Sequence, residues 1–160
     1  MKNLILLCGK PGCGKTTLAK IIKEKTGAVH FSADRFMLKL FGEVEDRELF
    51  ERKLFACKEL IYEICDELEG KNDIVLDFGF WTRREREYIS KRFTNFNVIF
   101  VYMRLDDEEI FRRIENRNKH LKADEYFMDK DTFNILSAKF EEPSESEGRI
   151  IFVDKDTIIK

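Results

Sequence analysis

The sequence predicts an α/β fold in which helices cover both faces of a parallel β-sheet. Short apolar segments of strand length alternate with amphipathic segments of helix length along the chain. A glycine-rich loop joins the first strand directly to the first helix, as is typical of parallel sheets. The 160 residues contain no internal repeat and no low-complexity linker. We therefore expect a single domain that spans residues 1–160.

The expected strands are apolar runs, and the expected helices have apolar residues at three- and four-residue steps. The strands are expected at about 3–8, 28–32, 74–77, 97–103 and 149–154. The helices are expected at 15–26, 34–42, 44–69, 82–93, 106–118 and 131–140, with Thr82 as an N-cap. The polar segment at about 118–131 is expected to form a mobile lid, and the acidic stretch 141–148 a connecting loop.

Composition and charge narrow the possible classes of function. The formal net charge is −2, so no overall positive field attracts nucleic acid. No apolar run approaches the roughly 20 residues of a membrane span, and the first strand begins almost at Met1. We therefore expect no membrane partner and a cytoplasmic location. The four cysteines lack metal-ligand spacing, which argues against a zinc site.

The glycine-rich loop has the spacing of a phosphate-binding loop. Gly9, four further residues and then Gly14-Lys15-Thr16 match the pattern G-x-x-x-x-G-K-[ST] between a strand and a helix. Glycine lets the backbone approach a polyphosphate closely, and the free N–H groups at a helix start bind anions. Lys15 is expected to reach the β- and γ-phosphates of ATP, and Thr16 to ligate Mg²⁺. The predicted nucleotide-binding residues are Gly9, Lys10, Pro11, Gly12, Cys13, Gly14, Lys15, Thr16 and Thr17.

Two aspartates follow expected strands, at the sheet edge that faces the ligand in open α/β folds. Asp77 ends the third strand and is the predicted carboxylate on the Mg²⁺ side, although it could simply cap the next turn. Asp34 follows the second strand. It could accept or orient the proton of an attacking hydroxyl, or it could be the N-cap of the next helix. His30, within the second strand, has the pattern of a packed strand residue.

Arginines and one tryptophan lie where a phosphotransferase could use them. Arg113 and Arg117 are four residues apart before the expected lid, so they share a helix face and could stabilise a transferring phosphoryl group. A solvated basic helix end is the alternative. Trp81 and Arg83 follow the third strand and could contact the substrate. The alternative is a packed tryptophan beside arginines that form surface ion pairs.

The chain as a whole resembles the small P-loop kinases, a group that includes AAA-domain ATP-binding proteins and is related to zeta toxins, chloramphenicol phosphotransferase and polynucleotide 5′-kinase. Residues 9–16 (GKPGCGKT), 32–35 (SADR), 76–83 (LDFGFWTR), 113–118 (RIENRN) and 140–143 (FEEP) carry the resemblance. It implies the strand order 2-3-1-4-5 and a closing lid. It also implies that Asp34 is the catalytic carboxylate, that Arg35 contacts the substrate, and that Arg113 and Arg117 are lid arginines. By the same similarity, adenine would lie near Lys155 and Asp156.

The leading hypothesis is that the protein is an ATP-dependent kinase that phosphorylates a hydroxyl of a small-molecule acceptor. ATP is expected in preference to GTP, because residues 118–121 (NKHL) have Leu121 where the guanine-reading pattern needs aspartate. A kinase of nucleic-acid 5′ ends is an alternative, with Arg35, Arg83 and Arg86 as a basic lip. A nucleotide-binding regulatory ATPase is a further one.

Overall fold

A parallel five-stranded sheet forms the centre of the computed structural model, which describes residues 1–123 and 125–154. The strands are β1 (Asn3–Cys8), β2 (Val29–Ser32), β3 (Ile74–Gly79), β4 (Asn97–Met103) and β5 (Ile150–Val153). They lie in the order β2-β3-β1-β4-β5, and every neighbouring pair is parallel. The predicted fold class and strand order are confirmed.

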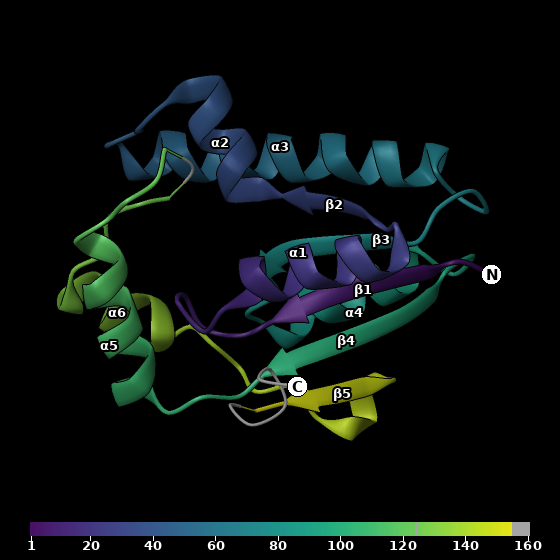
Figure 1. Ribbon diagram of the computed structural model, residues 1–160. Coiled ribbons are helices and arrows are strands. Elements are labelled where there is room, and N and C mark those ends of the chain that lie inside the picture. Colours follow the sequence, from purple (N-terminus) through teal and green to yellow (C-terminus); the bar gives the residue numbers. More distant parts are fainter. Residues whose placement is uncertain (124, 155–160) are drawn as a thin grey trace.

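Helices cover both faces of this sheet (Figure 1). One face packs against α3 (Arg47–Glu67) and α4 (Arg83–Arg92), and the other against α1 (Lys15–Thr26). The helices α5 (Asp107–Asn118) and α6 (Lys130–Ser137) extend the second layer beyond the carboxyl ends of the strands, where the arrowheads point (Figure 1). The short helix α2 (Ala33–Phe41) follows β2 and lies beside α3.

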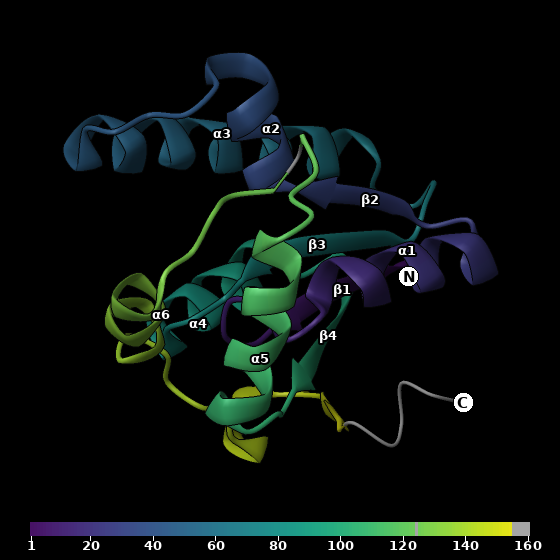
Figure 2. The ribbon, with the colours of Figure 1, turned by 60° about the vertical axis from the view of Figure 1, so that its left-hand side comes forward.

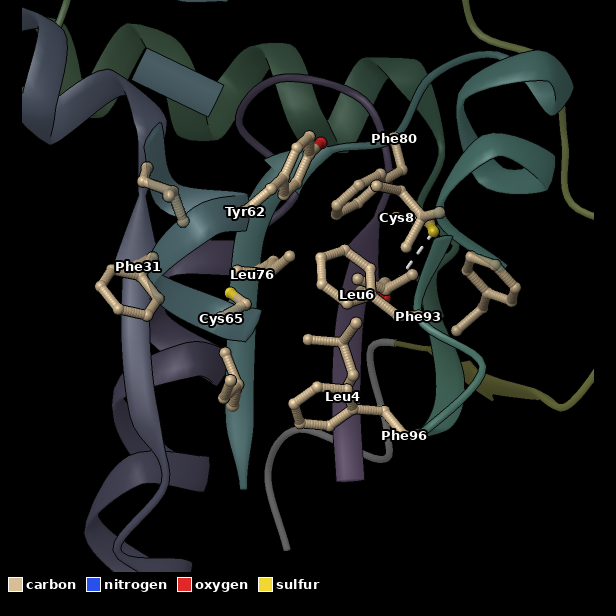
Figure 3. Close-up of a cluster of buried hydrophobic side chains, with 14 of the residues drawn as sticks. Leu4, Leu6, Cys8, Phe31, Tyr62, Cys65, Leu76, Phe80, Phe93 and Phe96 are labelled. Carbon is tan, nitrogen blue, oxygen red and sulfur yellow. Dashed lines mark hydrogen bonds between the residues drawn. The ribbon is translucent and has the colours of Figure 1, made fainter. Parts of the chain in front are cut away.

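Alternation along β1 explains how one strand supplies both halves of the core. Leu4, Leu6 and Cys8 point toward α3 and α4, and Figure 3 shows them among aromatic rings from β2, from α3 and from the segments that flank α4. Leu7 points to the opposite face, where it packs with residues of α1 and α5. Side chains on both faces are buried because the sheet is covered twice, and this is why the strand is a continuous apolar run.

Caps account for most differences between expected and observed element ends. The helix expected at 44–69 spans Arg47–Glu67, because the Asp46 carboxylate accepts a hydrogen bond from Leu49 N at 2.7 Å. Thr82 is the N-cap of α4, as predicted. The expected loop 141–148 contains a short 3₁₀ helix, Glu145–Glu147.

Among the described residues, no helix combines the length and apolarity needed to cross a bilayer.

Candidate active site

The phosphate-binding loop is folded for close approach of a polyphosphate. Gly12 and Gly14 adopt φ angles of 79° and 103°, which other residues rarely reach. A Cβ on Gly12 would lie only 2.5 Å from Cγ1 of Ile114, so the loop packs tightly against α5. Cys13 is fully buried beneath the loop. Thr17 is exposed in the first turn of α1.

Two lysine side chains stabilise this loop, one through hydrogen bonds and the other through an ion pair. The Lys15 ammonium donates hydrogen bonds to the carbonyl oxygens of Gly9 at 3.0 Å and Lys10 at 2.8 Å. Lys10, in turn, forms an ion pair of 2.6 Å with Asp107 at the start of α5. The cationic end of Lys15 therefore lies against the loop that is predicted to cradle phosphates, and α5 is tied to the same loop.

Asp77 and Thr16 meet at the carboxyl end of β3. The Thr16 hydroxyl donates to Asp77 Oδ2 at 2.6 Å, and His30 Nε2 lies 3.8 Å from the same oxygen. Burial alone would raise the pKa of Asp77, but His30, the charge of Lys15 and the Thr16 hydroxyl outweigh it and lower that pKa. Asp77 is thus a buried carboxylate beside a hydroxyl, and oxygen atoms of this kind are the ligands that Mg²⁺ prefers in proteins.

The structure separates two roles that the sequence left open for Asp34. The N-cap of α2 is Ser32, whose Oγ accepts from Arg35 N at 3.4 Å, so Asp34 is not the cap. Asp34 lies in the first turn of α2, two residues after Ser32, which pairs with Asp77; β3 itself continues to Gly79, beyond its expected end at residue 77. Its side chain is exposed to solvent. The surrounding protein and the charge of Asp77 raise the pKa of Asp34, against the opposing charges of Lys15, Lys58 and Arg117.

The two predicted lid arginines point in different directions. Arg113 Nε pairs with Glu109 at 2.8 Å, and its Nη1 reaches to within 3.8 Å of the position that a Cβ on Gly14 would occupy. Arg117 Nη2 donates to the Tyr126 carbonyl oxygen at 3.1 Å, and its charge acts on Asp34. Arg113 therefore flanks the phosphate-binding loop, and Arg117 lies toward Asp34.

The segment between α5 and α6 reaches across to α2 and α3 (Figure 2). The Asn118 side chain joins the two ends of this segment, because it donates to Met128 O at 2.7 Å and accepts from Met128 N at 3.3 Å. At its far end the ring of Tyr126 meets Phe50 of α3 edge to face, with centroids 6.1 Å apart. Asp34 contributes to a raised pKa of Tyr126, about 12, after burial as the main cause. The segment expected to be a lid thus brings Tyr126 near Asp34, and its role as a lid stays a prediction.

The predicted substrate contacts are only partly brought together. Arg35 donates from Nη2 to His30 O at 3.5 Å, next to Asp34. Trp81 is half-buried and packs its indole onto Gly79. Arg83 is exposed on α4 and pairs with Glu87 at 2.9 Å, the surface pairing that we considered as its alternative. The packing of α4 therefore leaves the Arg83 side chain at the protein surface.

Arg86 is buried in an ion pair and is not a basic lip residue. Its guanidinium contacts Glu147 at 2.6 Å, both side chains are almost fully inaccessible, and Nη1 donates to Phe80 O at 2.9 Å. Phe80 has a positive φ of 44°, and the carbonyl oxygen of Gly79 accepts from Gly9 N at 3.2 Å. Arg86 and Glu147 therefore hold the turn against which the phosphate-binding loop begins.

Lys58 is a site residue that the sequence did not reveal. It lies in the middle of α3, with its side chain mostly buried, and its ammonium pairs with Glu85 at 3.2 Å. Its charge also acts on Asp34. A lysine within a long amphipathic helix carries no motif, so no sequence signal could distinguish it from the other charged residues of α3. Lys155 and Asp156, near which adenine was expected, lie outside the described residues.

Comparison with known proteins decides the family. The family model described as an AAA domain matches residues 4–143. The chain belongs to this family. It is 32% identical over 125 residues to the adenylate kinase of Ruminiclostridium cellulolyticum, covering 71% of this chain and 58% of that enzyme. Adenylate kinase of Mesomycoplasma hyopneumoniae is 26% identical, and the match covers 84% of this chain and 65% of that enzyme. The AAA-family chain thus spans less than two thirds of the length of these relatives.

Solved structures share its fold along nearly the whole chain. A protein of inferred kinase function from Chloroflexus aurantiacus has a TM-score of 0.77 at 18% identity, covering 99% of this chain and 87% of its own. Kti12 from Chaetomium thermophilum, solved in complex with ADP-AlF3, has a TM-score of 0.73 at 19% identity. The match covers 96% of this chain and 89% of Kti12. The AAA-family chain therefore has the fold of the small P-loop kinases.

Proposed function

We propose that this protein transfers the γ-phosphoryl group of ATP to a hydroxyl of a small-molecule acceptor, with Mg²⁺ as its cofactor. One observation carries the proposal: two aspartates of opposite character face the same end of the sheet. Asp77 is buried, anionic and bonded to the phosphate-binding loop, whereas Asp34 is reached by solvent and has a raised pKa. The first suits a metal ligand, and the second suits a group that takes up a proton.

The nucleotide side would act through backbone and charge. The N–H groups of the loop and the first turn of α1 would bind the β- and γ-phosphates, and Lys15 would neutralise their charge. Thr16 and Asp77 would hold Mg²⁺, which supplies further neutralisation of the triphosphate when bound. Arg113, which flanks Gly14, is placed to approach the transferring group. These groups stabilise charge that grows as the bond to the γ-phosphorus breaks.

The acceptor side would act through Asp34. A hydroxyl must lose its proton as its oxygen attacks phosphorus, and the carboxylate of Asp34 would accept that proton. The new O–P bond forms as the β–γ bridge breaks, with its electron pair leaving on ADP. Lys58, Arg35 and Arg117 surround Asp34 and would orient the acceptor. A phosphate acceptor is already an anion. It needs no proton acceptor, so a carboxylate in that role favours an alcohol.

Screening with γ-labelled ATP tests the proposal. Purified protein and Mg²⁺ are incubated with separate pools of sugars and polyols, of nucleosides, of AMP, and of a 5′-hydroxyl oligonucleotide. We expect label in a small-molecule hydroxyl, and loss of that label in Asp34→Asn. Label in AMP or only in the oligonucleotide would overturn the acceptor class. ATP hydrolysis with no labelled acceptor would instead favour a regulatory ATPase.

A further inference from the structure

We propose that His30 is a positioning residue that fixes the Asp77 carboxylate against Thr16 for metal-dependent ATP binding. The inference rests on the proposed function, because it assigns a role within the same Mg²⁺-binding part of the site. No motif contains His30, and within its strand it has the pattern of an ordinary packed residue.

Strand register brings His30 to Asp77. His30 pairs with Val75 and Ser32 with Asp77 across β2 and β3, so the side chains at 30, 75 and 77 point to the same face of the sheet. This is the face covered by α1, whose first turn contains Thr16. The side chains of His30 and Asp77 are 3% and 5% exposed, so water has little access to the pair.

No hydrogen bond within the described residues accounts for the burial of the His30 imidazole nitrogen Nε2. His30 Nε2 is buried and has no hydrogen-bond partner within the described part of the chain. A buried polar atom without a partner costs about 1–3 kcal/mol, so its retention calls for a reason. The nearest charged oxygen is Asp77 Oδ2 at 3.8 Å, just beyond hydrogen-bond length. A small rotation of the carboxylate would close that gap.

The arrangement gives Asp77 two restraints on one oxygen. Oδ2 accepts from Thr16 at 2.6 Å on the loop side, and on the strand side it faces His30 Nε2 at 3.8 Å, which could donate to it after a small rotation. Held between them, the carboxylate stays at the side of the loop where the triphosphate and metal would bind. Groups that orient a metal-binding carboxylate typically contribute 10–100-fold to metal affinity. We expect a contribution of that size from His30.

Calorimetry of ATP binding, with Mg²⁺ or with EDTA, tests this without an acceptor. His30→Phe keeps the bulk but removes the N–H, and His30→Gln restores a nitrogen donor at similar reach. We expect His30→Phe to weaken ATP binding in Mg²⁺ by at least about 10-fold, and to leave the ATP affinity in EDTA unchanged. His30→Gln should recover part of the lost affinity. Circular dichroism confirms that each variant is folded, and His30→Met replaces His30→Phe if the ring is not accommodated.

A double-mutant cycle separates positioning from packing. In an Asp77→Asn background, His30→Phe should cause no further loss of Mg²⁺-dependent affinity, because its partner carboxylate is gone. Equal Mg²⁺ dependence in folded His30→Phe and wild type would overturn the role of His30 and leave the proposed function standing. ATP binding that is indifferent to Mg²⁺ in the wild type would overturn both. Failure to find a phosphorylated acceptor would count against the proposed function alone.

Discussion

The proposed nucleotide side and the proposed acceptor side of the site are built in different ways. The nucleotide side comes from one continuous segment, β1 through the first turn of α1, joined by Asp77. Its groups already contact one another, as in the 2.6 Å bond from Thr16 to Asp77. The acceptor side gathers Asp34 from α2, Lys58 from α3 and Tyr126 from the segment between α5 and α6. One half is fixed by local chain geometry, and the other depends on how distant segments pack.

The largest effect should come from removing the charge of the nucleotide side. We expect Lys15→Ala to lower phosphoryl transfer by roughly 10³-fold, because it removes a cation from a site where phosphate charge has few other partners. Initial rates with γ-labelled ATP measure the loss. Lys20→Ala, on the exposed side of the same helix, is the matched control and should keep its rate. Comparable rates in both variants would contradict the assignment of the loop.

The two aspartates should give opposite kinetic signatures. Asp34→Asn should lower kcat at least about 10²-fold with little change in the KM for ATP, because it removes a proton acceptor. Asp77→Asn should chiefly raise the KM for Mg·ATP. Steady-state kinetics on the acceptor found in the screen measure both. If Asp34→Asn instead weakened ATP binding and kept its turnover, the two sides of the site would be wrongly divided.

The buried ion pair beneath the loop should affect stability more than any surface pair. Arg86→Met leaves Glu147 buried without its partner and frees Phe80 O, so we expect a loss of about 3–5 kcal/mol in the free energy of unfolding. Urea denaturation measures it. Arg47→Met breaks an exposed pair with Glu51 and should change stability little. Equal midpoints would show that the turn at Gly79 does not depend on Arg86.

The smallest effect distinguishes the aspartates by pH. The pKa of Asp34 is raised in the folded state, so its ionisation destabilises the fold as pH rises through that pKa. Asp34→Asn should therefore raise the Tm at pH 7, and the gain should vanish as pH falls and the wild-type carboxyl becomes protonated. The pKa of Asp77 is lowered, so Asp77→Asn should lower the Tm at pH 7. Thermal unfolding from pH 4 to 7 tests both signs.

Sequence patterns predicted the strand, glycine-rich loop and helix of residues 3–26 for a physical reason. The spacing from Gly9 to Thr16 sets backbone conformation locally, and each element it joins has its own periodicity. The same reasoning left Asp34 open between an N-cap and a proton acceptor, because both roles suit aspartate at a helix start. The placement of Ser32 as the cap removes the first role, and the second stays a prediction. The assignments of Lys15, Asp34, Arg113 and Arg117 as catalytic groups remain predictions.

Arginines show where sequence reasoning fails. Arg83 and Arg86 lie three residues apart on α4, yet one is exposed and paired to Glu87 while the other is buried against Glu147. Helical spacing alone could not show which residue the 3₁₀ helix at Glu145–Glu147 would cover. Glu147 is 61 residues from Arg86, so no local pattern connects them.

The sequence by itself determined the strands of the sheet and the phosphate-binding loop at their carboxyl ends, because these follow from short-range periodicity and from glycine geometry. Tertiary structure decided which charges face that end. The register of β2 on β3 brings His30 to Asp77, and the packing of α3 brings Lys58 toward Asp34. Such contacts join residues that are far apart in the chain, and their charges act through burial and distance, which only the folded molecule sets.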